Sequence, residues 1–173
     1  MYSSTHGYAV GTDGTLIKTT DGGETWNKIL HTNDTSGVAD MIMDPSNPNK
    51  LFVAMWQHRR TPWSLSSGGQ GSGLYMTFDG GKNWKKIGAK EGVPEGNFGR
   101  IGLAISRSNP NSVYALVEAT KNGLYKSDDG GLSWTLMNSN PEFVSTRPFY
   151  FQEIAVDPPN ENRVWLIYQM IAK

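Results

Sequence analysis

The 173-residue chain is predicted to be an all-β protein that forms a partial β-propeller, with two full four-stranded antiparallel blades and two partial ones. Two observations predict this fold: one octapeptide pattern occurs three times, and a second turn pattern recurs in phase with it. The composition agrees, because 20 glycines, 6 tryptophans and a charged fraction of 18% are typical of a chain rich in turns and short strands.

The first repeated pattern is a Thr/Ser-x-Asp-Gly-Gly-x-x-Trp segment that follows a short strand-like stretch. Asp-Gly between two apolar strands is a strong signal for a tight hairpin, in which glycine adopts positive φ and aspartate accepts hydrogen bonds from turn amides. The tryptophan is expected to cover the hairpin with a large apolar face. The residues assigned to this structural role are Asp21, Gly23 and Trp26, then Asp79, Gly81 and Trp84, then Asp129, Gly131 and Trp134.

The second pattern is an Asn-containing turn between two strands, at residues 44–48, 106–110 and 157–160. Each full unit then contains four strand candidates, A to D. They lie near 38–43, 51–56, 74–77 and 84–87 in one unit, and near 100–105, 113–118, 124–126 and 134–137 in the next. The B candidate at 51–56 is almost continuously apolar, which predicts burial on both faces, as a blade between two neighbours requires.

These units predict a single repeat domain over residues 1–173. The expected division is a partial blade at 1–30, full blades at 38–88 and 100–138, and a partial blade at 149–173. Closed propellers need about 4–8 blades, and repeat arrays need protected ends. We therefore expect either a fragment of a longer propeller or a chain that closes by self-association.

The three octapeptides have the pattern of the Asp box, or BNR repeat, and the chain resembles Asp-box β-propeller proteins. From residue 11 onward it is similar to bacterial sortilin N-terminal-type and glycosyl-hydrolase-like propellers, on the segments 44–48, 54–56, 60–63, 66–69, 71–75 and 99–102. Residues 7–11 and 18–21 also resemble the photosystem II assembly-factor propellers. The resemblance implies a ligand-binding propeller, and it favours an extracellular or periplasmic location.

Charge and composition exclude several functions. Lysine plus arginine equals aspartate plus glutamate at 16 each, which argues against a nucleic-acid partner. The absence of cysteine excludes a thiolate metal site or a cysteine nucleophile, and no apolar run is long enough for membrane insertion. The three histidines lack metal-ligand spacing, and the calcium-loop pattern is absent after the Asp-box aspartates. We expect no metal and no cofactor.

A candidate ligand-binding face follows from the blade topology. In a four-stranded meander the B–C and D–A connections share one face, opposite the Asp boxes. The B–C connection at 57–73 is far longer than its counterpart at 119–122. Long loops on a rigid scaffold often bind ligands, and Arg and Trp are usual anchors. The candidate residues are His58, Arg59, Arg60, Trp63, Arg100, Arg147 and Tyr150. The open alternatives are a loop that packs on the neighbouring blade with Trp63 as its plug, and solvated or ion-paired structural roles for Arg100 and Arg147.

The leading functional hypothesis is a non-catalytic binding scaffold of the sortilin-like type, which presents this face to a peptide or protein or to a glycan. The alternative is a glycoside hydrolase, sialidase-like or xyloglucanase-like, with Asp40 and Glu153 as its carboxylate pair. These two residues occupy equivalent positions on the A strands, which line a propeller channel. A sialidase also needs an arginine triad and a tyrosine nucleophile. Arg59 or Arg60, Arg100, Arg147 and Tyr150 fit by residue type, but the Arg-Ile-Pro motif is absent. A purely structural propeller segment is the third possibility.

Overall fold

The computed structural model describes residues 5–11, 13–144, 147–167 and 171–172. Within these ranges the chain is all-β except for one short 3₁₀ helix, η1 (Ala89–Glu91), and no helix is long and apolar enough to cross a membrane. In the predicted partial blades, residues 1–4, 12, 168–170 and 173 lie outside the described residues.

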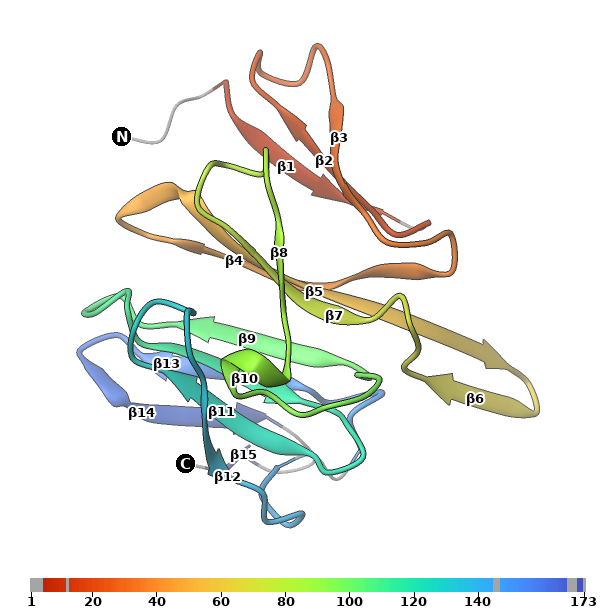
Figure 1. Cartoon of the computed structure of the whole chain (residues 1–173), viewed down its shortest axis with the longest axis vertical. Coiled ribbons are helices and arrows are strands. Elements are labelled where there is room, and N and C mark those ends of the chain that lie inside the picture. The colour runs from red at the N-terminus through yellow and green to blue at the C-terminus, as the bar shows by residue number, and fades with distance from the viewer. Residues whose placement is uncertain (1–4, 12, 145–146, 168–170, 173) are drawn as a thin grey trace.

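Four antiparallel sheets follow one another along the chain, and each packs beside the next (Figure 1). The first contains β1 (Gly7–Val10), β2 (Thr15–Thr19) and β3 (Asn27–His31). The second contains β4 (Ser36–Asp44), β5 (Asn47–Thr61), β7 (Gly73–Thr77) and β8 (Lys85–Ile87), with β6 (Ser64–Ser67) paired to the far end of β5. The third contains β9 (Ile101–Ile105), β10 (Val113–Val117), β11 (Gly123–Ser127) and β12 (Thr135–Asn138). The fourth contains β13 (Glu153–Asp157), β14 (Asn160–Ile167) and β15 (Ile171–Ala172). The predicted all-β, blade-based fold is confirmed.

Strand β5 is buried on both faces, as its apolar sequence predicted. Successive side chains of a strand point to opposite faces of the sheet. Phe52 and Ala54 accordingly belong to the core between the second and third sheets, while Val53 and Met55 pack with residues of the first sheet. All four are fully buried. The two-sided burial of β5 holds the second blade between its neighbours.

Each Asp box closes its hairpin with the same hydrogen bonds. At the second box, Asp79 accepts bonds from the backbone and side-chain nitrogens of Asn83, at 2.9 and 2.7 Å, and from the Thr77 hydroxyl at 2.7 Å. The amide of Gly81 donates to the Thr77 hydroxyl at 3.1 Å. The equivalent aspartate partners are Thr19 and Thr25 in the first box, and Ser127 and Ser133 in the third. Because the Asn83 backbone and side-chain bonds stabilise the ionised form, they hold the pKa of Asp79 well below its usual value.

The second glycine of the Asp box lies against the preceding blade, where a side chain would not fit. Gly131 has φ of 99°, and a Cβ built on it would lie 2.3 Å from Cε1 of Phe52. Gly81 has φ of 92°, and its Cβ would lie 2.6 Å from Cδ1 of Ile29. A side chain at either position would therefore meet the preceding blade as well as an unfavourable backbone conformation.

The Asp-box hairpins and the Asn-containing turns lie at one end of the blades, as predicted. The amide of Gly80 donates to the Asn49 carbonyl, and the amide of Gly130 donates to the Asn111 carbonyl, both at 2.9 Å. Lysines also join neighbouring blades at this end, because Lys50 Nζ donates to the Pro110 carbonyl at 3.1 Å. In Figure 1 the β4–β5, β9–β10 and β13–β14 turns lie at the left, and the β5–β6 hairpin projects at the right.

One expectation about the long B–C connection is wrong. Residues 57–67 were expected to be a loop, but they form a regular β-hairpin in which β5 continues beyond the blade and β6 returns. Trp63, expected in one alternative to be a plug against the neighbouring blade, is 86% exposed at the tip of this hairpin. The core ends near Met55, so the continuation of β5 has no apolar pattern to mark it as strand.

Candidate functional site

The β5–β6 hairpin places its side chains on two faces. His58 pairs with Ser67 and Arg60 pairs with Leu65, so alternation puts His58 and Arg60 on one face and Arg59 on the other. Trp63 lies in the turn between the two strands. Arg59 and Arg60 are adjacent in the sequence, but they lie on opposite faces of the hairpin.

The base of the hairpin is fixed to the third blade through a chain of hydrogen bonds. Trp56 Nε1 donates to the Ser67 hydroxyl at 2.9 Å, and that hydroxyl donates to Glu118 Oε2 at 2.6 Å. The same carboxylate oxygen accepts the Arg100 backbone amide at 2.6 Å. These contacts link β5, β6 and the segments flanking β9 and β10. The hairpin therefore projects from a fixed base.

Four aromatic rings gather beside this base, two from β5 and two from the segment before β13. The Trp56 and His58 rings stack with centroids 4.0 Å apart, and Phe149 meets Trp56 edge-on at 4.9 Å. Tyr150 continues the row, 5.3 Å from Phe149. Stacked and edge-on geometries are the favoured arrangements of aromatic pairs.

Three arginines lie over this aromatic row. Arg100 lies over Trp56 at 5.7 Å from the ring centroid, and its guanidinium donates to the Phe149 carbonyl at 3.3 Å. Arg60 and Arg147 lie 5.3 and 5.2 Å from the Tyr150 centroid. We call this set the aromatic–arginine cluster; its members are Trp56, His58, Arg60, Arg100, Arg147, Phe149 and Tyr150.

The cluster contains five of the seven residues predicted for the ligand face. His58, Arg60, Arg100, Arg147 and Tyr150 come together, whereas Arg59 lies on the other face of β5 and Trp63 lies at the hairpin tip. Sequence reasoning missed Trp56, which was assigned to the buried B strand, and Phe149. The aromatic run at 149–151, directly after Arg147, is the signal that could have identified Phe149.

The two carboxylates of the glycosidase alternative line one small cavity. Asp40, Glu153 and Arg100 face a space of about 260 Å³, together with Gln152 and Ile101. Asp40 is held in place by two backbone amides, from Met41 and from Leu103 of the next blade, both at 2.8 Å. Burial raises the pKa of Asp40, and this effect outweighs the two amide bonds and the Arg100 charge, which favour the ionised form. Glu153 is exposed.

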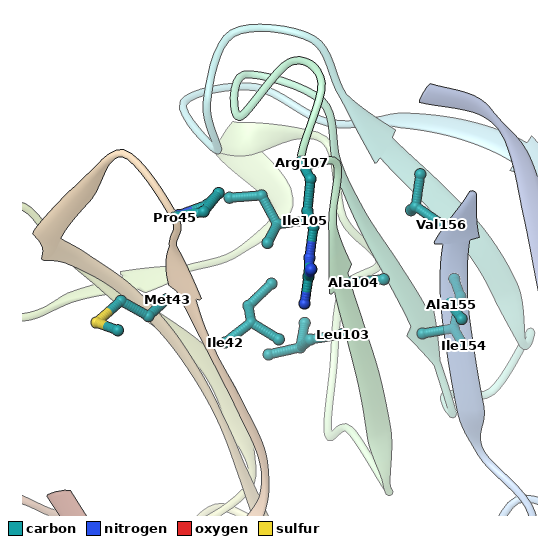
Figure 2. A pocket seen from close by; sticks show the side chains of 10 residues that line it. All are labelled: Ile42, Met43, Pro45, Leu103, Ala104, Ile105, Arg107, Ile154, Ala155 and Val156. Carbon is teal, nitrogen blue, oxygen red and sulfur yellow. The ribbon is translucent and has the colours of Figure 1, made fainter. Parts of the chain in front are cut away.

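A larger cavity of about 570 Å³ lies between the innermost strands of three blades, β4, β9 and β13. Figure 2 shows side chains of all three strands around it, with the Arg107 side chain extending from the β9–β10 turn toward Leu103. Its lining is mainly aliphatic, from Ile42, Ile105 and Ile154, with Arg107 as the charged member. This lining contains no carboxylate, so the cavity has no acid–base pair. Among the described residues, no group of three or more His, Asp or Glu could hold a metal ion.

Comparisons with known proteins agree with the fold. A family model described as the BNR/Asp-box repeat matches residues 75–86, which contain the second predicted box. A curated relative, a probable oligoxyloglucan-reducing end-specific xyloglucanase of Neosartorya fischeri, is 25% identical over 134 residues. That match covers 75% of this chain and 15% of the relative.

Two crystal structures of GH74 enzymes have the same fold over most of this chain. The GH74 enzyme of Niastella koreensis matches with a TM-score of 0.65 and 20% identity, covering 94% of this chain and 25% of that one. The GH74 xyloglucanase of Xanthomonas campestris matches with a TM-score of 0.64 and 18% identity, covering 88% and 22%. The chain thus spans a quarter or less of these relatives.

Fold, hairpins and comparisons agree: this chain has the fold of a partial β-propeller with Asp-box repeats, and over that fold it is similar to GH74 glycoside hydrolases. The finer likeness to sortilin-type propellers stays a prediction.

Proposed function

We propose that this chain is a non-catalytic, glycan-binding part of a longer β-propeller, and that the ligand lies along the hairpin between Trp63 and Tyr150. One observation carries the proposal: Trp63 is 86% exposed at the tip of the hairpin. A large aromatic ring held in solvent offers a flat apolar face at no cost in ordering a loop. Such rings are typical binding anchors.

The neighbouring side chains support a sugar ligand. Arg60 and Tyr150 provide polar groups close to an apolar surface, which suits the mixed faces of a pyranose ring. The similar enzymes are named for xyloglucan, which favours a glycan over a peptide. Xyloglucan is therefore the first polysaccharide to test.

The test is affinity electrophoresis and calorimetry with xyloglucan and a panel of other polysaccharides. Trp63→Ala is expected to weaken binding by about tenfold or more, the effect of losing a binding anchor. Phe78→Ala is the matched control, because Phe78 is an exposed aromatic residue (49%) in the second Asp box, at the opposite end of the blade. If the Trp63 variant binds as tightly as the wild type, the assigned face is wrong. If no polysaccharide binds at all, the purely structural alternative takes its place.

A glycoside hydrolase is the second candidate, because Asp40 and Glu153 line the same cavity with Arg100. Burial makes Asp40 the candidate general acid, and exposed Glu153 would act as base or nucleophile. The expected result is release of reducing ends from xyloglucan that Glu153→Gln abolishes without loss of fold. Release of reducing ends that persists in this variant would exclude the pair, and absence of release from the wild type would leave binding as the function.

A further inference from the structure

We infer that the ligand of the aromatic–arginine cluster carries carboxylate groups, as in a glycan that contains uronic acid. The inference rests on the proposed function and specifies its ligand. It begins from Arg60 and Arg147, which reach the same Tyr150 ring from β5 and from the segment before β13. The guanidinium carbons lie 5.3 and 5.2 Å from the ring centroid, so they are no more than 10.5 Å from each other.

Neither guanidinium has a carboxylate partner within ion-pair distance in the part of the chain that the structure describes. Arg163, by contrast, pairs with Asp157 at 3.0 Å, so the fold does form arginine ion pairs elsewhere. The nearby Glu118 carboxylate is occupied by the Ser67 hydroxyl and a backbone amide. The third arginine of the cluster, Arg100, faces Asp40 and Glu153 across their shared cavity. Within the aromatic–arginine cluster, Arg60 and Arg147 are therefore the two arginines whose positive charge has no carboxylate nearby among the described residues.

Two like charges at one ring repel each other, and a carboxylate that contacts either guanidinium offsets part of this charge. The Tyr150 ring attracts both guanidinium groups through cation–π contacts, so both lie beside it before a ligand arrives. Arginine presents a planar fork of donors that matches a carboxylate. Both arginines and Tyr150 are exposed, so a ligand can reach them directly.

An acidic sugar combines the two chemistries that this surface offers. Its ring can lie against an exposed aromatic side chain such as Trp63, and its carboxylate can accept hydrogen bonds from guanidinium groups. The chain as a whole has a formal net charge of zero, so this local charge is not a consequence of a basic protein. A neutral glycan can accept hydrogen bonds from these arginines, but it leaves both positive charges without a counter-charge.

The test compares an oligogalacturonide with its methyl ester, because esterification removes the charge and keeps the sugar chain. By calorimetry at low salt, the wild type is expected to bind the free acid about tenfold or more tightly than the ester, and raised salt should reduce this preference. Arg60→Gln and Arg147→Gln should each reduce it, and the double variant should abolish it. Arg60→Lys combined with Arg147→Lys should retain part of it, because charge is kept while the fork is lost.

Arg107→Gln is the matched control, because Arg107 is an exposed arginine at the turn end of the blades. It should keep the full preference. Circular dichroism of each variant establishes that the fold is intact. Equal affinity for the acid and the ester would overturn this inference and leave the proposed function standing. Absence of binding to both oligosaccharides and to xyloglucan would overturn both.

Discussion

The packing of the Asp-box tryptophans makes a quantitative prediction. Trp134 of the third box is 4% exposed and meets Phe52 of the preceding blade edge-on, with ring centroids 6.4 Å apart. Its Nε1 also donates to the Gly131 carbonyl at 3.1 Å. Replacement of a buried tryptophan by alanine removes apolar contacts and leaves a cavity, and such changes cost about 3–5 kcal/mol. We expect Trp134→Ala to lower the free energy of unfolding by this amount.

Trp26→Ala is the matched control, because Trp26 occupies the same position in the first box. Its Nε1 donates to the Gly23 carbonyl at the same distance, 3.1 Å, but the side chain is 43% exposed. A half-buried ring forfeits about half the transfer free energy, and water fills the vacated space, so the expected cost is about 2 kcal/mol. The two variants should differ by about 2 kcal/mol, or about 4–8 °C in melting temperature for a chain of this size.

The assay is urea unfolding followed by far-ultraviolet circular dichroism, since both variants remove a tryptophan fluorophore. The comparison uses the unfolding free energies of the two variants and the wild type under one set of conditions. Equal destabilisation by Trp26→Ala and Trp134→Ala would refute the reasoning that each box tryptophan derives its stabilisation from the preceding blade.

Two further predictions concern the Asp-box turns. Because hydrogen bonds from Asn83 lower the pKa of Asp79 in the folded chain, their stabilisation is present above the unfolded value of 3.8 and is lost as pH falls below it. The urea concentration at the unfolding midpoint should therefore decrease as pH is lowered below about 4, and this decrease should be smaller in Asp79→Asn. An equal decrease in the variant would contradict the assignment of this pH dependence to Asp79. Gly131→Ala should destabilise the chain by about 1 kcal/mol more than Gly23→Ala, because both glycines have φ near +100° but only a Cβ at Gly131 meets Phe52. Equal unfolding free energies for the two glycine variants would show that the close approach is not costly.

The fold could be predicted because its determinants are local and repeated. The bonds of Asp79 connect residues within four positions of one another, so the octapeptide alone specifies the hairpin. The alternation of Phe52 and Val53 between two cores follows from the pleat of a single strand. Such patterns can be recognised in a sequence without knowledge of the neighbouring blade.

The candidate site could be predicted only in part, because its determinants are distant in sequence. Trp56 and Phe149 meet across more than ninety positions, and no local pattern records that contact. The strand continuation at 57–61 is polar on both faces since it leaves the core, so it lacks the alternation that marks a strand. The turn at 62–63 is Pro-Trp, which is not a standard two-residue hairpin signal. Blade topology pointed to Arg60 and Arg147 through the connections that carry them, and residue type alone pointed to Tyr150.

The bonding of Asp40 gives a physical reason to rank binding above catalysis. Its two carboxylate oxygens each accept a backbone amide, and the bond from Leu103 joins β4 to the next blade. A general acid must carry a proton on one of these oxygens, and the resulting hydroxyl is a weaker acceptor than a carboxylate oxygen. Each catalytic cycle would therefore weaken either the tie to Met41 or the tie between blades. A carboxylate whose role is only to hold two blades in register has no such conflict.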